Sequence, residues 1–310
     1  MPQIQVPRRH HYIPEFYLRR WTSGKGTLVQ FSKPRPGRNE VKALRVYPKQ
    51  TGFVDRLYEL HGVEPEVAHK YETEFFKPVD TKAANVLAKF EAGQFEVSDE
   101  ERSAWTHFVL ALVLRHPEQV AAFGRYMTDA VERDPSLARR GRFKLPDGRT
   151  ADLARIQDEL ASGEGISRVA MVTLARTIAN RPAGEAFINK QWGLIRTPVG
   201  APALLTSDRP ILWEQAMDHP DFCLLMPVGP KRIFFAANWR TMMAARLTGN
   251  RTAPFVNLLN DHVVRRAVRF VYGLGEHALP FVQERMGMNP RHTIIDTLFE
   301  IPPHKGRRRE

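Results

Sequence analysis

The order of the sequence patterns along the chain limits its fold more than any single residue does. Period-two alternation in GTLVQFSK (26–33) and the run ALRVYP (43–48) predict two neighbouring strands. Helical periodicity follows from residue 65 to residue 182. Short apolar runs separated by Pro, Gly and Asp then predict strands, and the segment 256–273 is helical again. Strands at both ends of the chain around a helical middle predict an α+β fold.

We expect a mixed or antiparallel sheet built from the N- and C-terminal segments, with the central helical region packed on it. Residues 1–302 then form a single domain, β-rich at 1–60 and 183–302, with a helical insert at 61–182. Residues 303–310 form a disordered basic tail. A separate helical domain is the alternative. Within the insert, Ser98 and Glu101 make a capping box, which predicts a helix that begins there.

The charge balance concerns partners rather than fold. The chain has 46 Lys and Arg against 34 Asp and Glu, a net charge of +12, and such a surface attracts polyanions. Nucleic acid is the favoured partner, and a generic basic surface or an acidic protein partner are the alternatives. No apolar run approaches a membrane span, the N-terminus has no signal-peptide core, and a single cysteine fits a reducing compartment. We therefore expect a cytoplasmic protein.

The stretch RRHHYIPEFYLRRW (8–21) is the densest in chemistry. Its second half predicts a short helix at 13–22, with Pro14 in the first turn. Adjacent residues in an extended segment point to opposite sides, so only one of His10 and His11 is expected to face a site. That imidazole is a candidate base, acid or metal ligand. The other reading is a structural role for both.

HHYIPEFYLRRW resembles the opening motif of the bacterial and phage family called DUF4238. The plan of the family continues through YETEFFKPVDTKAANVL, LALVLRHP, TSDRPI, LMPVGP and LNDHVVRRAVRFVYG, which together cover nearly the whole chain. The chain departs from that pattern at Asp80, where Glu is usual, and at His116, where a small polar residue is commoner. The resemblance selects residues to weigh and implies no activity.

Asp208 is the second candidate for catalysis. It lies just past an apolar strand in ALLTSDRPI, where side chains at the end of a sheet border clefts. It is a candidate metal ligand or a residue that orients a histidine, and Ser207 beside it is a candidate substrate-binding residue. The alternative is turn chemistry, in which the Asp side chain accepts local backbone N–H bonds.

A metal site requires further carboxylates, and the acidic helix supplies Glu72, Glu74 and Asp80. With Asp208, the pair Glu74 and Asp80 is a candidate set for Mg²⁺ or Mn²⁺, whose ligands are mostly oxygen. The competing and favoured reading is an ion network with arginines. Arg19 and Arg115 lie on otherwise apolar helix faces and require an anion, either a protein carboxylate or a substrate phosphate.

These residues predict a nucleic-acid-acting phosphodiesterase, a nuclease of defence, toxin or phage type. The sequence does not decide whether it depends on Mg²⁺ or Mn²⁺. His10, His11, Asp208, Arg19 and Arg115 are the candidate catalytic residues. The candidate substrate-binding residues are Arg8, Arg9, Ser207 and Asn260. No P-loop, dinucleotide fingerprint, zinc motif or nucleophile elbow occurs in the sequence. The alternative is a non-catalytic protein that binds nucleic acid or another protein.

Overall fold

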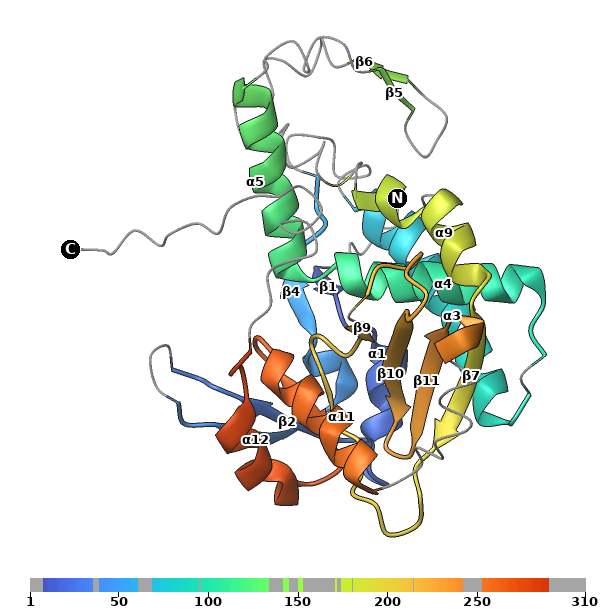
Figure 1. The fold of residues 1–310 in the computed structure, drawn as a ribbon. Coiled ribbons are helices and arrows are strands. Elements are labelled where there is room, and N and C mark those ends of the chain that lie inside the picture. Colours follow the sequence, from blue (N-terminus) through green and yellow to red (C-terminus); the bar gives the residue numbers. More distant parts are fainter. Residues whose placement is uncertain are drawn as a thin grey trace, which may run out of the picture.

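The described part of the chain contains two four-stranded antiparallel sheets, two two-stranded ones and the helices packed around them (Figure 1). The computed structural model describes residues 8–35, 39–60, 69–94, 96–133, 142–144, 150–152, 171, 174–179, 181–213, 215–241 and 253–289. The predicted α+β class is confirmed. The expected basic tail at 303–310 and most of the basic loop around residue 140 lie outside these residues.

The first sheet joins the two ends of the chain. Its strand order is β3 (Lys42–Val46), β2 (Leu28–Ser32), β12 (Val271–Gly273) and β8 (Thr206–Ser207). Val271 of β12 pairs with Phe31 on one side and with Ser207 on the other. The predicted pairing of residues 26–33 with 43–48 is therefore present, and so is the joining of N- and C-terminal segments.

The second sheet comes entirely from the C-terminal half, where the sequence analysis expected one shared sheet. Its order is β7 (Gln191–Arg196), β11 (Arg232–Ala237), β10 (Cys223–Gly229) and β9 (Leu212–Trp213). The predicted start of the strand region was early, because α9 (Arg181–Ile188) precedes β7. The predicted helix 256–273 was too long, since α11 (Ala253–Arg266) ends before β12 begins.

Helices cover both faces of the second sheet. On one face α3 (Lys77–Glu91) and α4 (Asp99–Leu114) supply Phe90 and Trp105, whose rings pack at 5.4 Å from each other. Trp105 also lies 5.3 Å from Phe234 of β11. On the other face Ile233 packs against Val256 and Leu259 of α11. The capping box of Ser98 and Glu101 starts α4 as predicted.

The remaining elements complete the outline of the molecule. α5 (Pro117–Arg133) follows α4 and extends away from the sheets in Figure 1, and α12 (Leu279–Arg285) lies beside α11. The short pieces are η2 (Pro48–Gln50), η4 (Glu276–Ala278), β5 (Arg142–Lys144) and β6 (Thr150–Asp152). Among the helices that the structure describes, none has the length and apolar character to cross a membrane.

The N-terminal motif is anchored at the centre of the fold. β1 (Arg9–His11) pairs with β4 (Phe53–Asp55), and α1 (Glu15–Leu18) and η1 (Arg19–Trp21) follow. The hydroxyl of Tyr17 donates to the carbonyl of Pro227 at 2.6 Å, and the indole N–H of Trp21 donates to the carbonyl of Leu204 at 2.8 Å. These bonds join the motif to segments that contribute to both sheets.

Candidate functional site

The two adjacent histidines have different environments. His10 is fully buried, its ring stacks on Tyr58 at 5.5 Å, and its Nδ1 accepts the Tyr58 backbone N–H at 2.9 Å. An imidazole nitrogen that accepts a bond carries no proton, so the neutral ring of His10 has its hydrogen on Nε2. His10 is thus held in one tautomer by the fold, which suits a positioning role.

The backbone around β1 is shaped to hold this segment in place. Gly52 has a positive φ of 68°, and a Cβ there would lie 3.1 Å from atoms of Ile13. Its carbonyl accepts the N–H groups of both Tyr12 and Ile13. Arg56 also has a positive φ, 56°, which is uncommon for a residue with a side chain. Such backbone outliers concentrate at functional sites.

His11 points to the other side of β1 and keeps an unused nitrogen. It is half-buried, its ring packs edge-on against Phe53, and its Nε2 has no hydrogen-bond partner in the described part of the chain. Burial lowers the pKa of His11 below its usual 6.5, and the nearby charge of Arg115 adds to that effect. His11 is therefore neutral at physiological pH, which is the state that a general base requires.

Arg115 lies at the end of α4 and is completely buried. Its Nη1 donates to both carboxylate oxygens of Asp80, at 2.9 and 3.1 Å. Its Nε and Nη2 have no hydrogen-bond partner among the described residues. A buried guanidinium with two unused donors is costly unless an anion fills the position. Arg115 is thus oriented by a protein carboxylate and still has donors for a second anion.

Glu72 is the second acid near Arg115. It lies in η3, a π-helical turn at Tyr71–Phe76 that runs directly into α3, and π turns are frequent at functional sites. Burial raises the pKa of Glu72 to about 7, against the lowering effect of Arg115, and its Oε2 has no hydrogen-bond partner in the described ranges. Burial also raises the pKa of Asp80. Glu72 is thus a carboxyl that exchanges a proton near neutral pH.

Tyr12 and His116 connect this cluster to Asp208. The ring of His116 meets Tyr12 edge-on at 5.3 Å, and its Nε2 lies 3.9 Å from Oδ2 of Asp208. Burial raises the pKa of Tyr12 well above its usual value, and the Asp208 carboxylate raises it further. Neither the Tyr12 hydroxyl nor Nε2 of His116 has a hydrogen-bond partner among the residues that the structure describes.

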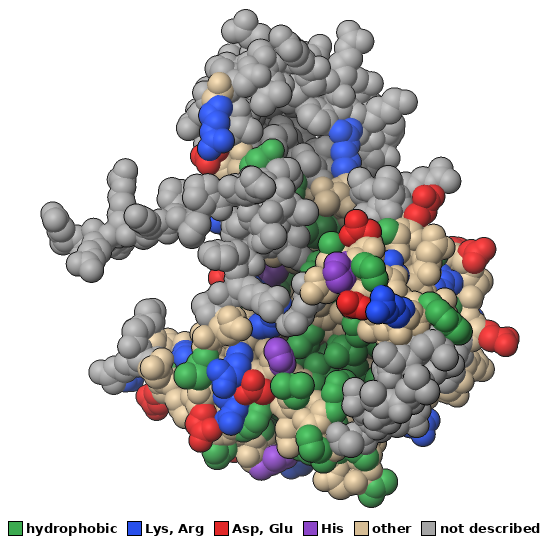
Figure 2. Space-filling model, viewed as in Figure 1, with side chains coloured by type: hydrophobic (Ala, Val, Ile, Leu, Met, Phe, Trp, Pro, Cys, Tyr) green, Lys and Arg blue, Asp and Glu red, His purple; other side chains and the backbone are tan. Residues whose placement is uncertain are grey.

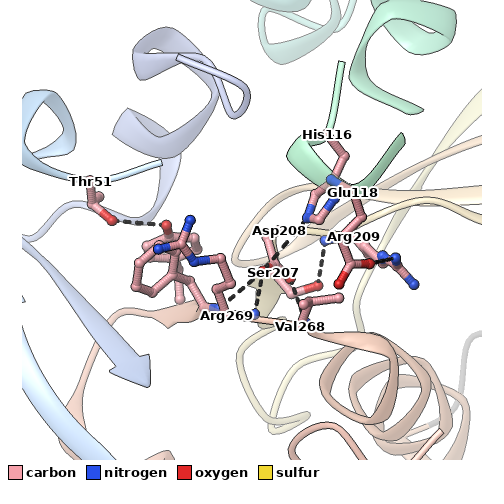
Figure 3. Close-up of polar contacts among 10 residues, drawn as sticks. Thr51, His116, Glu118, Ser207, Asp208, Arg209, Val268 and Arg269 are labelled. Atoms are coloured by element: carbon pink, nitrogen blue, oxygen red, sulfur yellow. Dashed lines mark hydrogen bonds and ion pairs between the residues drawn. The ribbon is translucent and has the colours of Figure 1, made fainter. Parts of the chain in front are cut away.

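Both carboxylate oxygens of Asp208 accept backbone hydrogen bonds. Oδ1 accepts the N–H of Val268 at 3.0 Å, and Oδ2 accepts the N–H groups of Arg269 and Phe270 at 2.5 and 3.1 Å. Figure 3 shows Asp208 between His116 and the loop that carries Val268 and Arg269. The carboxylate is thus a brace that closes the connection between α11 and β12. The turn interpretation predicted a backbone acceptor correctly but placed the donors locally, whereas they lie in residues 268–270.

Ser207 and Asn260, which the sequence predicted to bind substrate, are also hydrogen-bonded within the protein. The Ser207 hydroxyl is buried and accepts the Arg209 N–H. Asn260 on α11 accepts the Leu205 N–H at 2.8 Å and donates to the Ala203 carbonyl at 3.0 Å. Both side chains hold the extended segment that leads into β8, so their polar atoms face protein rather than an open site.

The outer arginines of the motif lie at the surface. Arg19 is 65% exposed and pairs with Glu15 one helical turn earlier, so the prediction that it lies on an apolar face was wrong. Arg8 is also exposed and pairs with Asp55 at 3.5 Å, while Arg9 is exposed and its guanidinium lies over the Phe53 ring. All three residues are exposed, and each already has a contact with a protein group.

The predicted metal set is not assembled. Glu74 is exposed and lies 3.8 Å from Lys70, Asp80 binds Arg115, and Asp208 binds backbone amides. Within the described ranges no group of three His, Cys, Asp or Glu side chains has the geometry to hold a metal ion. The favoured interpretation, an ion network with arginines, holds for Asp80, which pairs with Arg115.

The positive charge is dispersed on the face that can be inspected. Figure 2 shows Lys and Arg side chains intermixed with Asp and Glu over α11 and α12. Arg265 and Arg285 both pair with Asp261 there, and Arg20 pairs with Glu91 on another part of the surface. The described residues therefore form no patch of a single sign on this face, and the clusters at Arg139 and Arg307 lie outside them.

Sequence reasoning set two site residues aside. His116 was treated as incidental, although it follows Arg115 directly and precedes the proline that starts α5, and the chain departs from the family pattern there. Tyr12 was read only as part of the motif, although it follows His11. The available signal was that each directly follows a residue already singled out, Arg115 for His116 and His11 for Tyr12.

The comparisons with known proteins agree with the opening motif. No curated protein and no solved structure matches the chain. The model of the family described as "Protein of unknown function (DUF4238)" matches residues 9–276, from the first strand to the turn after β12. Because this match spans most of the chain and includes His11, Tyr12, Glu72, Arg115 and Asp208, the protein belongs to the DUF4238 family.

Proposed function

We propose that the protein is a phosphodiesterase that acts on nucleic acid and that its centre is the cluster of His11, Glu72 and Arg115. The observation that carries the proposal is that the buried guanidinium of Arg115 has hydrogen-bond donors that no described protein group accepts. Its Nη1 is held by Asp80, while Nε and Nη2 remain without a described partner in a buried position. A planar guanidinium presented in this way matches the oxygens of a phosphate diester.

The groups around Arg115 supply the other requirements of phosphoryl transfer. His11 is neutral near pH 7 and has a free Nε2, so it serves as general base. Glu72 is protonated below about pH 7 and serves as general acid. Arg115 stabilises the charge that develops on the phosphoryl oxygens. His11 and Glu72 are half-buried as residues, while the unpartnered atoms Nε2 of His11 and Oε2 of Glu72 are buried.

The choice of nucleic acid rests on charge. The net charge of +12 favours polyanions in association. The exposed Arg8 and Arg9 lie at the start of the motif, Arg8 just before β1 and Arg9 two residues before His11 in it. A brace-only role for the cluster is less favoured, because a structural ion network leaves few buried polar atoms unpaired. Here His11, Tyr12, Glu72 and Arg115 all have such atoms.

Nuclease assays with matched variants test the proposal. Purified protein is incubated with mixed-sequence single-stranded RNA and DNA, with EDTA or with added Mg²⁺ or Mn²⁺. We expect cleavage by the wild type, a loss of at least about 100-fold in His11→Gln, and no change in the exposed control His277→Gln. Absence of cleavage under all conditions, or wild-type cleavage by His11→Gln, contradicts the proposal. Salt-dependent binding without cleavage would identify a non-catalytic binding protein.

A further inference from the structure

We infer that the free edge of β7 is a docking site for an extended, acidic segment of a partner protein, which adds to the second sheet as a further strand. β7 lies on the outer side of that sheet in Figure 1, and it pairs only with β11 in the described part of the chain. A free strand edge presents a row of unpaired backbone N–H and C=O groups, which is a template for another strand.

The register of β7 shows which of its backbone groups face the open edge. Thr197 donates its backbone N–H to the Lys231 carbonyl, one residue past the β7–β11 ladder. Hydrogen-bonded pairs alternate along an antiparallel ladder, so the odd-numbered residues of β7 bond to β11. The N–H and C=O groups of Trp192, Leu194 and Arg196 therefore point outward, and they have no hydrogen-bond partner among the described residues.

The chain just before β7 is covered, in contrast to β7 itself. Nη2 of Arg102 in α4 donates to the carbonyls of Ile188 and Lys190, the latter at 3.0 Å. The same guanidinium lies 4.0 Å from the centre of the Trp192 ring. Protein groups thus occupy the carbonyls that precede β7, whereas the outward backbone groups from Trp192 onward are left for another strand.

A small pocket borders this edge on the α4 face of the sheet. Trp192 and Leu194 pack toward the core formed with α3 and α4, whereas Ile195 packs toward α11. The pocket has a volume of about 40 Å³ and is lined by Phe90, Val97, Arg102, Trp192, Leu194 and Phe234. It has room for the end of one apolar side chain, since small-molecule sites measure about 300–1,000 Å³. Alternate residues of an added strand project to this face.

The charges at the edge favour an acidic partner. Arg196 is exposed and lies directly opposite Arg232 in the ladder, where like charges repel. Arg232 pairs with Glu91, whereas Arg196 has no ion pair within the described ranges. A carboxylate opposite Arg196 on the added strand supplies the missing counterion. A second copy of the chain would bring more cations to this edge, and each copy has a net charge of +12.

The edge strand of the first sheet, β3, differs from β7 in its charge. Lys42 and Arg45 are exposed charges within its five residues, and such charges discourage pairing with another chain. The four central residues of β7, Trp192–Ile195, carry no charge. An uncharged edge of this length favours strand addition, which is the behaviour expected of a docking site.

Fluorescence polarisation with a labelled, end-capped peptide tests the docking site. In antiparallel register, Thr-Glu-Thr-Val-Thr-Val-Thr places its Glu opposite Arg196 and its two Val residues opposite Leu194 and Trp192. We expect saturable binding to the full chain. N-methylation of the first Val should weaken binding at least about 10-fold, because that N–H is a ladder donor. N-methylation of the Thr that follows it should have little effect, because its N–H faces away from β7.

Matched variants of the protein test the same edge from the other side. Leu194→Pro removes one outward N–H and leaves the β11 ladder intact, and proline is tolerated at such edge positions. Peptide binding should fall at least about 10-fold in Leu194→Pro, whereas Leu194→Ala, which keeps the N–H, should bind within about threefold of the wild type. Arg196→Glu should weaken binding at least about fivefold, and the exposed control Lys49→Glu should not.

The contrary outcomes are equally specific. Absence of saturable binding up to about 1 mM peptide, or equal binding of the parent peptide and the form methylated at the first Val, overturns the docking site. Equal affinity of the wild type and Arg196→Glu overturns the acidic partner. A dimer in sedimentation that Leu194→Pro abolishes, without peptide binding, assigns the edge to a second copy instead. If Leu194→Pro does not fold, the methylated peptides decide alone.

Discussion

Asp208 and Arg115 are both buried charged residues near the N-terminal motif, and their surroundings differ in one respect. The Asp208 carboxylate accepts three backbone N–H bonds from residues 268–270. The Arg115 guanidinium has one nitrogen bound to Asp80, lies over the rings of Phe76 and Phe108, and has two nitrogens, Nε and Nη2, without a described hydrogen-bond partner. Protein groups therefore bind both carboxylate oxygens of Asp208, whereas two guanidinium nitrogens of Arg115 are left without a described hydrogen bond.

Under the proposed function, this difference separates a structural residue, Asp208, from a residue of the proposed site, Arg115. Completing a buried charge with protein groups stabilises a fold, whereas a charge left partly unpaired lowers stability and is retained where it binds something else. We therefore expect variants around Asp208 to change the free energy of unfolding, and variants around Arg115 to change activity.

The largest expected effect is on catalysis by His11. His11→Gln removes the general base and keeps a similar volume, so cleavage of nucleic acid should fall by about 10²–10⁴-fold. The melting temperature should stay within a few degrees, because the Nε2 of His11 makes no described hydrogen bond. Rates per folded molecule, with His277→Gln as control, measure it. If His11→Gln is strongly destabilised but its rate per folded molecule equals that of the wild type, the role of His11 is structural, like that of Asp208.

The second-largest effect is expected for Arg115→Lys. Lysine keeps the charge that neutralises Asp80 but cannot present two parallel donors to a phosphate. Cleavage should fall by about 10²–10³-fold, and the stabilisation of the wild type by added inorganic phosphate should disappear in thermal-shift measurements. A phosphate response equal to that of the wild type would show that the free donors of Arg115 are not the anion site.

The variant Asp208→Asn tests the stabilising role of Asp208. The amide replaces one acceptor oxygen by an NH₂ group that faces backbone donors. We expect a loss of about 2–4 kcal/mol in the free energy of unfolding, measured by urea denaturation. The exposed Asp218→Asn variant should change it by less than about 0.5 kcal/mol. Stability equal to the wild type in Asp208→Asn would refute the bracing role.

The smallest expected effect is a pH-dependent gain in stability in Glu72→Gln. The pKa of Glu72 is about 7 in the folded protein against an ordinary 4.5. Between these values the unfolded chain ionises while the folded one stays protonated, so the wild type loses stability as pH rises to 7. A neutral glutamine avoids that loss.

Glu72→Gln should therefore be about 1–3 kcal/mol more stable than the wild type at pH 8, with a smaller gain at pH 5. The exposed Glu74→Gln variant, whose carboxyl lies near Lys70, serves as the matched control and should show little pH-dependent change. A Glu72→Gln gain that is equal at both pH values would contradict the raised pKa.

Much of the fold follows from the sequence, and the reasons are local. Alternation in residues 26–33 predicted β2, and the capping box at Ser98 predicted the start of α4. The division into two sheets did not follow, because strand pairing depends on contacts such as Val271 with Phe31 and Ser207 that no local pattern encodes. The end of 256–273 was read as helix, because apolar residues at its end satisfy both periodicities.

The candidate site was only partly predictable, for a related reason. The motif identified His11, and the apolar face of α4 identified Arg115 as a charge in need of a partner. The sequence did not distinguish Glu72 from Glu74, because both are acidic residues of the same helical segment and no local pattern shows which of them is the less exposed. Nor did it show that the oxygens of Asp208 are filled by residues 268–270, about sixty positions away.

The most direct test of the central claim is the rate of nucleic-acid cleavage per folded molecule of Arg115→Lys and Asp208→Asn, measured side by side at a temperature where both are folded. The open coordination of Arg115 and the closed coordination of Asp208 predict a loss of about 10²–10³-fold in the first and a rate within about threefold of wild type in the second. Equal losses in both variants, or a larger loss in Asp208→Asn, would contradict the account.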